Sequence, residues 1–413
     1  MIDYKRYTLN NGLTVVLHED DSTPLVTVNI LYKIGAKNED PEQTGFAHLF
    51  EHLMFGGSEN IPDYDTPIQM AGGDNNAFTN ADITNFYNVM PAENLETALW
   101  LESDRMLQLD FSQESLDVQK KVVVEEFKET CINKPYGDMW HELSALAYES
   151  HSYRWPTIGL VPEHISEAKL SDVKNFFDNY YKPSNAVLVV AGNIDVPGTK
   201  ALIEKWFGKI PSGEISFREI PEELTQESYR LKVLQRAVPS DAIYMGFHMP
   251  DRKHKDFIVY DLLSDILSGG RSSRLYQNLV KSSTLFSSVN AYISGTVDPG
   301  LFVVEAKLLE GADMEAAKSA IWNELQKLVD NPLEESELQK VKNSMISGVE
   351  FSEVSITNKA INLAYYEMLG DLSLINTQVE EIDVVTTADI SRIAIDTFRK
   401  EKCSEIIYNR NEN

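Results

Sequence analysis

Residues 44–60 read TGFAHLFEHLMFGGSEN, and the rest of the chain is best understood outward from this stretch. Its apolar residues recur at helical spacing, which predicts a helix from about Gln43 to Phe55 that is buried on most sides. They are Phe46, Leu49, Phe50, Leu53 and Met54. The pair Gly56-Gly57 supplies a C-terminal stop signal.

The same helix carries His48, Glu51 and His52 in the pattern H-x-x-E-H. Residues four apart share a helix face, so the two imidazoles point the same way and can reach one metal ion at ~2.0–2.1 Å. Glu51 can reach a water molecule on that metal without being a ligand. The pattern is the inverted form of the H-E-x-x-H metalloprotease motif. The alternative is a chance pair of partly buried helix histidines, but buried polar groups are costly unless something pairs with them.

A catalytic metal site needs a third ligand, and the best source is residues 119–129, QKKVVVEEFKE. Glu126 lies four residues after Val122 and three after Val123, so it falls on the apolar stripe of a helix. Glu125 and Glu129 lie nearer the edge of that stripe. Periodicity therefore favours Glu126 as the ligand, against the alternative of a solvated acidic helix end.

Composition limits the class of protein. A length of 413 residues suggests two domains, and 64 acidic against 37 basic residues give a formal charge of −27. Such a surface argues against nucleic acid and anionic membrane as partners. Two distant cysteines exclude a disulfide framework. No secretory signal pattern is visible and no apolar run approaches a membrane span, so we expect a cytoplasmic protein.

Strand and helix patterns recur in the two halves of the chain. In each half a strand leads through a polar loop to a helix ending in Gly-Gly, at 56–57 and again at 269–270. This predicts an α+β fold of two similar α/β sandwich-like halves, mostly antiparallel sheet with packed helices, related by internal duplication. The expected domains are residues 1–215, with the metal site, and residues 231–413. Residues 216–230 form the linker.

The chain resembles the pitrilysin/insulinase family of zinc peptidases, which includes mitochondrial processing peptidase subunits and short bacterial members. The resemblance covers almost the whole sequence. It is carried by TGFAHLFEHLMFGGSEN, GGDNNAFTNADITNFY, VVVEEFKE, HSYRWPTIG and ILSGGRSSRLYQNLV. It implies one Zn²⁺ per chain, bound by His48, His52 and Glu126, with Glu51 as the base. Relatives often carry a further Glu where this chain has Gln119.

The resemblance also assigns roles elsewhere in the chain. An edge strand near the zinc holds substrate in this family, and the matching residues here are Asn76, Ala77 and Phe78. The alternative is an ordinary strand with a core phenylalanine. In the second half, alignment of the Gly-Gly pairs places Asp261, Ser264 and Asp265 opposite the HxxEH residues. A looser alignment places Gly348 opposite Glu126.

Many active relatives carry an Arg and a Tyr in the second half, where this chain has Val280 and Ser287. In heteromeric relatives one subunit carries the zinc motif and a homologous partner carries that pair. We therefore expect a zinc metalloendopeptidase that acts on unfolded peptides as part of a homo- or heterodimer. The alternatives are a non-catalytic core subunit of a larger complex and a metal-dependent hydrolase of other substrates.

Overall fold

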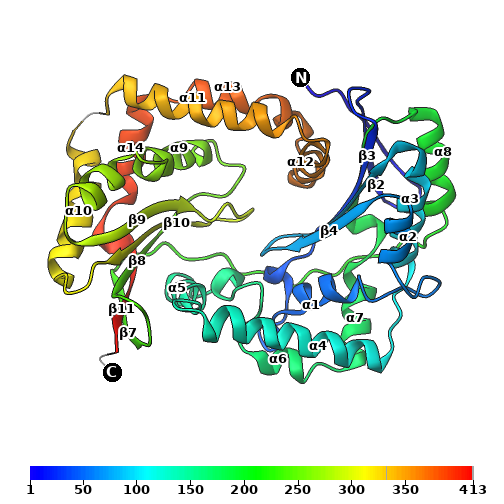
Figure 1. Cartoon of the computed structure of the whole chain (residues 1–413), viewed down its shortest axis with the longest axis horizontal. Coiled ribbons are helices and arrows are strands. Elements are labelled where there is room, and N and C mark those ends of the chain that lie inside the picture. The colour runs from blue at the N-terminus through cyan, green and yellow to red at the C-terminus, as the bar shows by residue number, and fades with distance from the viewer. Residues whose placement is uncertain (332, 412–413) are drawn as a thin grey trace. The chain divides into compact units, whose positions relative to one another are not determined.

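A computed structural model describes residues 1–331 and 333–411. The chain forms two compact units (Figure 1). Unit 1 comprises Met1–Glu129, Trp155–Ile220 and Glu350–Thr377, and unit 2 comprises Thr130–Arg154, Pro221–Val349 and Gln378–Asn413. The main division, between residues 220 and 221, lies inside the stretch predicted as the linker. Each unit also takes one segment from the opposite half of the sequence.

Unit 1 is built on a six-stranded sheet with the order β1-β2-β6-β3-β5-β4. The strands are β1 (Lys5–Thr8), β2 (Thr14–Glu19), β3 (Leu25–Tyr32), β4 (Asp74–Thr79), β5 (Thr84–Pro91) and β6 (Ala186–Gly192). Strands β2 and β6 run parallel and all other neighbours are antiparallel. The hairpin β1–β2 turns at Gly12, which has a φ of 91°.

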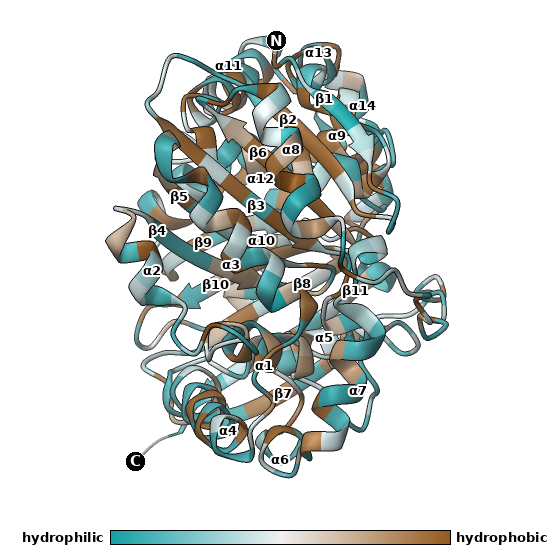
Figure 2. Cartoon of the chain, turned by 90° about the vertical axis from the view of Figure 1, so that its right-hand side faces the viewer, coloured by the Kyte–Doolittle hydropathy of each residue, from teal (hydrophilic) through white to brown (hydrophobic). Residues whose placement is uncertain are grey.

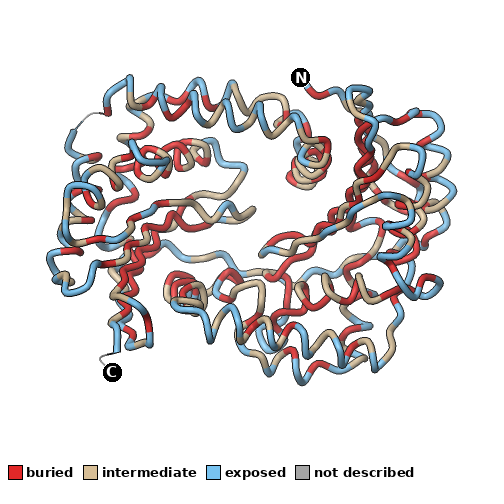
Figure 3. The backbone as a smooth tube through the Cα atoms, in the orientation of Figure 1, coloured by how far each residue is buried: buried red, intermediate tan, exposed pale blue. Residues whose placement is uncertain are grey.

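One face of this sheet carries the main core of unit 1. Alternate residues of β3, such as Val28 and Ile30, are fully buried against the helices on that face. These helices are α1 (Phe46–Leu53), α3 (Leu95–Leu107), α4 (Gln113–Phe127), α7 (Leu170–Tyr180) and α8 (Val196–Phe207), with two short ones, α2 (Asp65–Met70) and α6 (Pro162–Ser166). The central strands β3 and β6 are largely hydrophobic (Figure 2) and buried (Figure 3).

The other face of the same sheet is covered by α12 (Ile356–Leu369). This helix packs on β3 and β6, and the Thr357 hydroxyl lies 3.3 Å from that of Thr27 on β3. Strand alternation puts Leu31 and Val189 on the same face, and both are fully buried. A helix from the second half of the sequence therefore completes unit 1.

Unit 2 repeats the same topology. Its sheet has the order β7-β11-β8-β10-β9, with β7 (Arg230–Arg236), β8 (Ala242–His248), β9 (Phe286–Ile293), β10 (Leu301–Leu308) and β11 (Cys403–Arg410). Strands β7 and β11 run parallel and the other neighbours run antiparallel. This is the arrangement of β2-β6-β3-β5-β4 in the sheet of unit 1. The helices of the first core face are α9 (Phe257–Ser268), α10 (Met314–Asp330), α11 (Glu335–Ser352), α13 (Gln378–Asp383) and α14 (Thr387–Thr397).

The second face of the unit 2 sheet is covered by α5 (Met139–Ala147), which comes from the first half of the sequence. A Cβ on Gly246 of β8 would lie 3.2 Å from the Leu143 side chain, so glycine lets the helix approach the strand closely. The two halves have thus exchanged one helix each. This shared topology confirms the predicted α+β fold with two similar halves.

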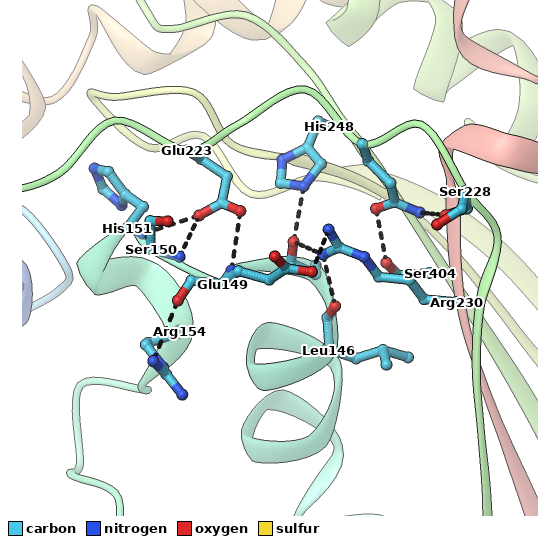
Figure 4. Close-up of polar contacts among 12 residues, drawn as sticks. Leu146, Glu149, Ser150, His151, Arg154, Glu223, Ser228, Arg230, His248 and Ser404 are labelled. Atoms are coloured by element: carbon cyan, nitrogen blue, oxygen red, sulfur yellow. Dashed lines mark hydrogen bonds and ion pairs between the residues drawn. The ribbon is translucent and has the colours of Figure 1, made fainter.

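The linker is fastened to the C-terminal end of α5 (Figure 4). The Glu223 carboxylate accepts hydrogen bonds from the backbone N–H groups of residues 149, 150 and 151 at 2.8–2.9 Å. Arg230 donates to the carbonyls of Leu146 and Ala147, and the imidazole of His248 also donates to Ala147. Two charged side chains and one histidine therefore hold the polypeptide where it passes from the first repeat to the second.

Most predicted elements are present, with small shifts at their ends. The helix expected from Gln43 to Phe55 begins at Phe46 and ends at Leu53. Ser112 caps α4, and its hydroxyl accepts from the N–H of Ser115 at 3.1 Å. Within the described residues, no helix is both long and apolar enough to cross a membrane.

Candidate metal centre

One face of helix α1 is buried in the core of unit 1. Phe50 is fully buried and stacks on Phe176 and Tyr181, with ring centroids 4.9 and 5.1 Å apart. Stacked aromatic contacts of this kind fix the rotation of a helix about its axis. His48 and His52 are thereby left on the opposite, partly exposed face, with side chains 14% and 24% exposed.

Helix α4 brings Glu126 to the two histidines. Its carboxylate oxygens lie 3.4 Å from Nε2 of His52 and 3.8 Å from Nε2 of His48. Val123 and Phe127 on the same helix are buried, which orients the Glu126 side chain toward α1. Candidate ligand atoms of the three residues all lie within 4.8 Å of one another. The structure therefore brings together the three residues that the sequence predicted as ligands.

These distances suit Zn²⁺. Tetrahedral ligands at 2.0–2.1 Å from one ion are separated from each other by about 3.3 Å. The observed separations of 3.4 and 3.8 Å from carboxylate to imidazole need only small side-chain movements to reach that value. Two imidazoles and one carboxylate also form a common donor set of catalytic zinc, which leaves a fourth position open.

Burial favours the neutral form of His48. The pKa of His48 is lowered chiefly by loss of hydration and further by His52, while Glu126 and Glu51 act in the opposite direction. A neutral imidazole is the form that binds a metal. Nδ1 of His48 is buried and makes no hydrogen bond within the described part of the chain. A zinc-bound imidazole usually donates its second N–H to a carboxylate or a carbonyl, and no described residue does this for His48.

Glu51 and the predicted substrate strand belong to the same unit as the candidate ligands. Glu51 lies on α1 and is partly exposed. Strand β4, which contains Asn76, Ala77 and Phe78, is an edge strand that pairs only with β5 and packs near α1. Asn76 is exposed and Phe78 is partly buried. The Ala77 N–H donates to the Asn76 side chain at 2.8 Å, and Ala77 pairs with Phe86 of β5.

Unit 2 differs at the corresponding positions. Asp261, Ser264 and Asp265 lie on α9, and burial raises the pKa of Asp261 to about 6. Among the described residues, the only group of three suitable metal ligands is that of unit 1. Val280 lies in a helical turn, Tyr276–Lys281, and the Ser287 hydroxyl on edge strand β9 donates to the carbonyl of Lys307.

Sequence reasoning missed the residues that build the start of α1. Gly45 is the N-cap, with a φ of 89°, and has no side chain with which to cap the helix. Glu39 does so instead, because its oxygens accept from the N–H groups of Gly45 at 2.8 Å and Ala47 at 2.7 Å. Burial raises the pKa of Glu39 to about 8, although backbone N–H groups oppose the shift. The only available signal was an acidic residue six positions before a glycine.

Two family profiles match most of the chain. The family profile described as Insulinase (Peptidase family M16) matches residues 14–157, and the profile described as Peptidase M16 inactive domain matches residues 168–345. The chain belongs to peptidase family M16, the pitrilysin/insulinase family.

Individual relatives cover nearly the whole chain. The zinc protease PqqE of Helicobacter pylori is 28% identical over 98% of this chain and 92% of its own length. A crystal structure of a protease from Helicobacter pylori, also 28% identical, superimposes with a TM-score of 0.92 over 99% of this chain and 100% of the other. Pitrilysin shares the fold at 17% identity with a TM-score of 0.78, and this chain covers 45% of it.

Proposed function

We propose that this chain is a zinc-dependent endopeptidase whose metal is held by His48, His52 and Glu126. The observation that supports it is the convergence of these three side chains from two helices, with all ligand atoms within 4.8 Å. Zn²⁺ in such a site supplies Lewis acidity, which polarises a peptide carbonyl and acidifies a water molecule. Membership of a family whose relatives are named zinc proteases supports the same reaction.

Glu51 is the general base in this proposal. It follows His48 by three residues and directly precedes His52, so it lies on the face of α1 that carries the ligands. It takes a proton from the attacking water and passes that proton to the leaving amine. The HxxEH pattern assigns it this role rather than that of a ligand.

The substrate is an extended, unfolded peptide that adds to the free edge of β4. Main-chain hydrogen bonds with an edge strand bind peptides with little regard to side-chain identity. Asn76, Ala77 and Phe78 form the proposed contact, and the partly buried Phe78 lines a pocket beside the scissile bond. The position of β4 at the sheet edge, near α1, supports this arrangement.

We further propose that the active form is a dimer. This chain corresponds to less than half of pitrilysin, so two homologous chains would supply an equivalent number of units. Val280 and Ser287 occupy the places where many relatives carry an Arg and a Tyr. A homologous partner that supplies this pair would make the present chain the catalytic subunit. The intact ligand set disfavours the alternative of a non-catalytic core subunit.

The decisive experiment combines metal analysis with cleavage of a quenched-fluorescent peptide library, with and without chelator. We expect Glu51→Gln to keep its zinc and to lose about 10²–10⁴-fold in turnover. Glu126→Gln loses the metal, whereas Glu125→Gln is the matched control, since Glu125 is exposed and bonded to Lys128. Retained peptidase activity in Glu51→Gln would refute the assignment of the base. Metal binding without peptide cleavage, alone or with a partner, would favour the other functions.

A further inference from the structure

The start of the metal-binding helix is held by a carboxyl group that belongs to neither the helix nor the ligand set. Glu39 is 1% exposed and each of its two oxygens accepts one backbone N–H, from Gly45 and from Ala47. The first of these residues is the N-cap of α1, and the second directly precedes His48. Glu39 therefore binds the backbone one residue away from a ligand.

Helix α1 depends on such support more than a long helix would. It has eight residues, and helices shorter than about 12–15 residues are marginal in water without tertiary contacts. The first four N–H groups of any helix lack partners within the helix. Gly45 contributes no side chain and adopts a left-handed conformation, so the cap has to come from elsewhere in the fold.

Glycine is required at position 45 by its surroundings. A Cβ there would lie 2.8 Å from the carbonyl oxygen of Ile158. Thr44 is fixed as well, since its N–H and its hydroxyl both form hydrogen bonds with Nδ1 of His164, at 3.1 and 2.8 Å. Trp155 donates to the carbonyl of Ala36 at 2.9 Å. The loop that carries Glu39 is thus anchored independently of the helix that Glu39 caps.

We propose that Glu39 is a positioning residue of the metal centre, which sets the place of His48 and His52 relative to Glu126 by fixing the first turn of α1. This inference rests on the proposed function, because it takes α1 as part of a zinc site. The required property is a pair of acceptor oxygens. Glutamine has a similar shape but would direct an NH₂ group, which cannot accept, at one of the two backbone N–H donors.

The test is the zinc affinity of Glu39→Gln, measured by competition with a chromophoric chelator, together with the visible absorption of the Co²⁺-loaded protein. We expect zinc affinity to fall about tenfold or more, which is the lower end of the loss seen when groups that orient metal ligands are replaced. The Co²⁺ bands should also change, which general destabilisation would not cause. The matched control is Glu324→Gln in unit 2, because Glu324 is equally buried and accepts from Asn278 and Lys327.

The outcomes separate the two proposals. A wild-type chain that binds no zinc would overturn the proposed function and this inference with it. A wild-type chain that binds zinc, with folded Glu39→Gln binding it equally well, would overturn the positioning role alone. If Glu39→Gln does not fold, Glu39→Asp is measured instead, since its side chain is one methylene too short to reach both donors. Wild-type affinity in folded Glu39→Asp would likewise overturn the inference.

Discussion

Replacement of Arg105 by methionine should destabilise unit 1 strongly. Arg105 and Glu102 lie one helical turn apart on α3, are 1% and 0% exposed, and form two hydrogen bonds with each other. The guanidinium also lies over the rings of Phe86 and Tyr64, at 4.3 and 4.5 Å from their centroids. The substitution removes these contacts and leaves the Glu102 carboxylate buried without its cation.

Removal of one partner from a buried ion pair costs about 3–5 kcal/mol. Glu102 keeps a hydrogen bond from Tyr64 and one from Asn88, so we expect the lower end of that range, about 3 kcal/mol. Urea unfolding of the metal-free protein, followed by circular dichroism, measures the loss. The double variant Glu102→Leu with Arg105→Met should recover only part of it, since no charge is then left buried but the buried Asn88 amide loses the carboxylate to which it donates.

The matched control is an ion pair of the same spacing at the surface. Lys128 and Glu125 are three residues apart, with side chains 45% and 67% exposed. Lys128→Met should change the free energy of unfolding by less than about 0.5 kcal/mol. A loss below about 1 kcal/mol in Arg105→Met, or equal losses in the two variants, would refute the reasoning from burial.

Two further predictions concern pH and metal. The pKa of Glu39 is about 8 in the folded chain against 4.5 in the unfolded reference, so its contribution to stability is fully present below about pH 4.5 and is lost as pH rises through 8. The difference in unfolding free energy between wild type and Glu39→Gln should therefore shrink from pH 5 to pH 9, by up to about 1.4 kcal/mol per pH unit. Urea titrations across this pH range measure the difference, and a difference that grows with pH would contradict the prediction. Zinc at a hundredfold excess over its dissociation constant should stabilise the chain by about 2.7 kcal/mol, and calorimetry with and without chelator should show no such gain in His52→Ala.

The sequence predicts which three side chains the structure brings together, because its signals are local. The HxxEH residues lie on one short helix, and Glu126 lies near them, one turn after the buried Val123 of α4. The other residue used for that prediction, Val122, is 44% exposed, so only part of the predicted apolar stripe faces the core. The strand and helix patterns of the two halves were recovered for the same reason. Which side chains share a helix face thus follows from spacing within single elements.

Other features depend on contacts between distant segments, which periodicity does not report. Glu39 caps a helix that begins seven residues later, whereas capping rules consider the residue at the helix end itself. Helix α1 starts three residues later than predicted because Gly45 adopts a left-handed conformation, and a Cβ at that position would lie 2.8 Å from the carbonyl oxygen of Ile158. The pairing of α5 and α12 with sheets of the opposite half was equally invisible, since amphipathicity shows that a helix is covered but not by what.

The exchange of α5 and α12 bears on how such a chain arose. A single ancestral repeat would have had no helix of its own for the second face of its sheet, and buried residues such as Leu31 and Val189 would have been bare. Two copies that traded this helix would have covered both faces, as in domain-swapped dimers. Either half of the sequence alone lacks the helix that covers one face of its sheet. Expression of residues 1–220 alone should accordingly yield aggregates, and co-expression with residues 221–411 should restore soluble protein.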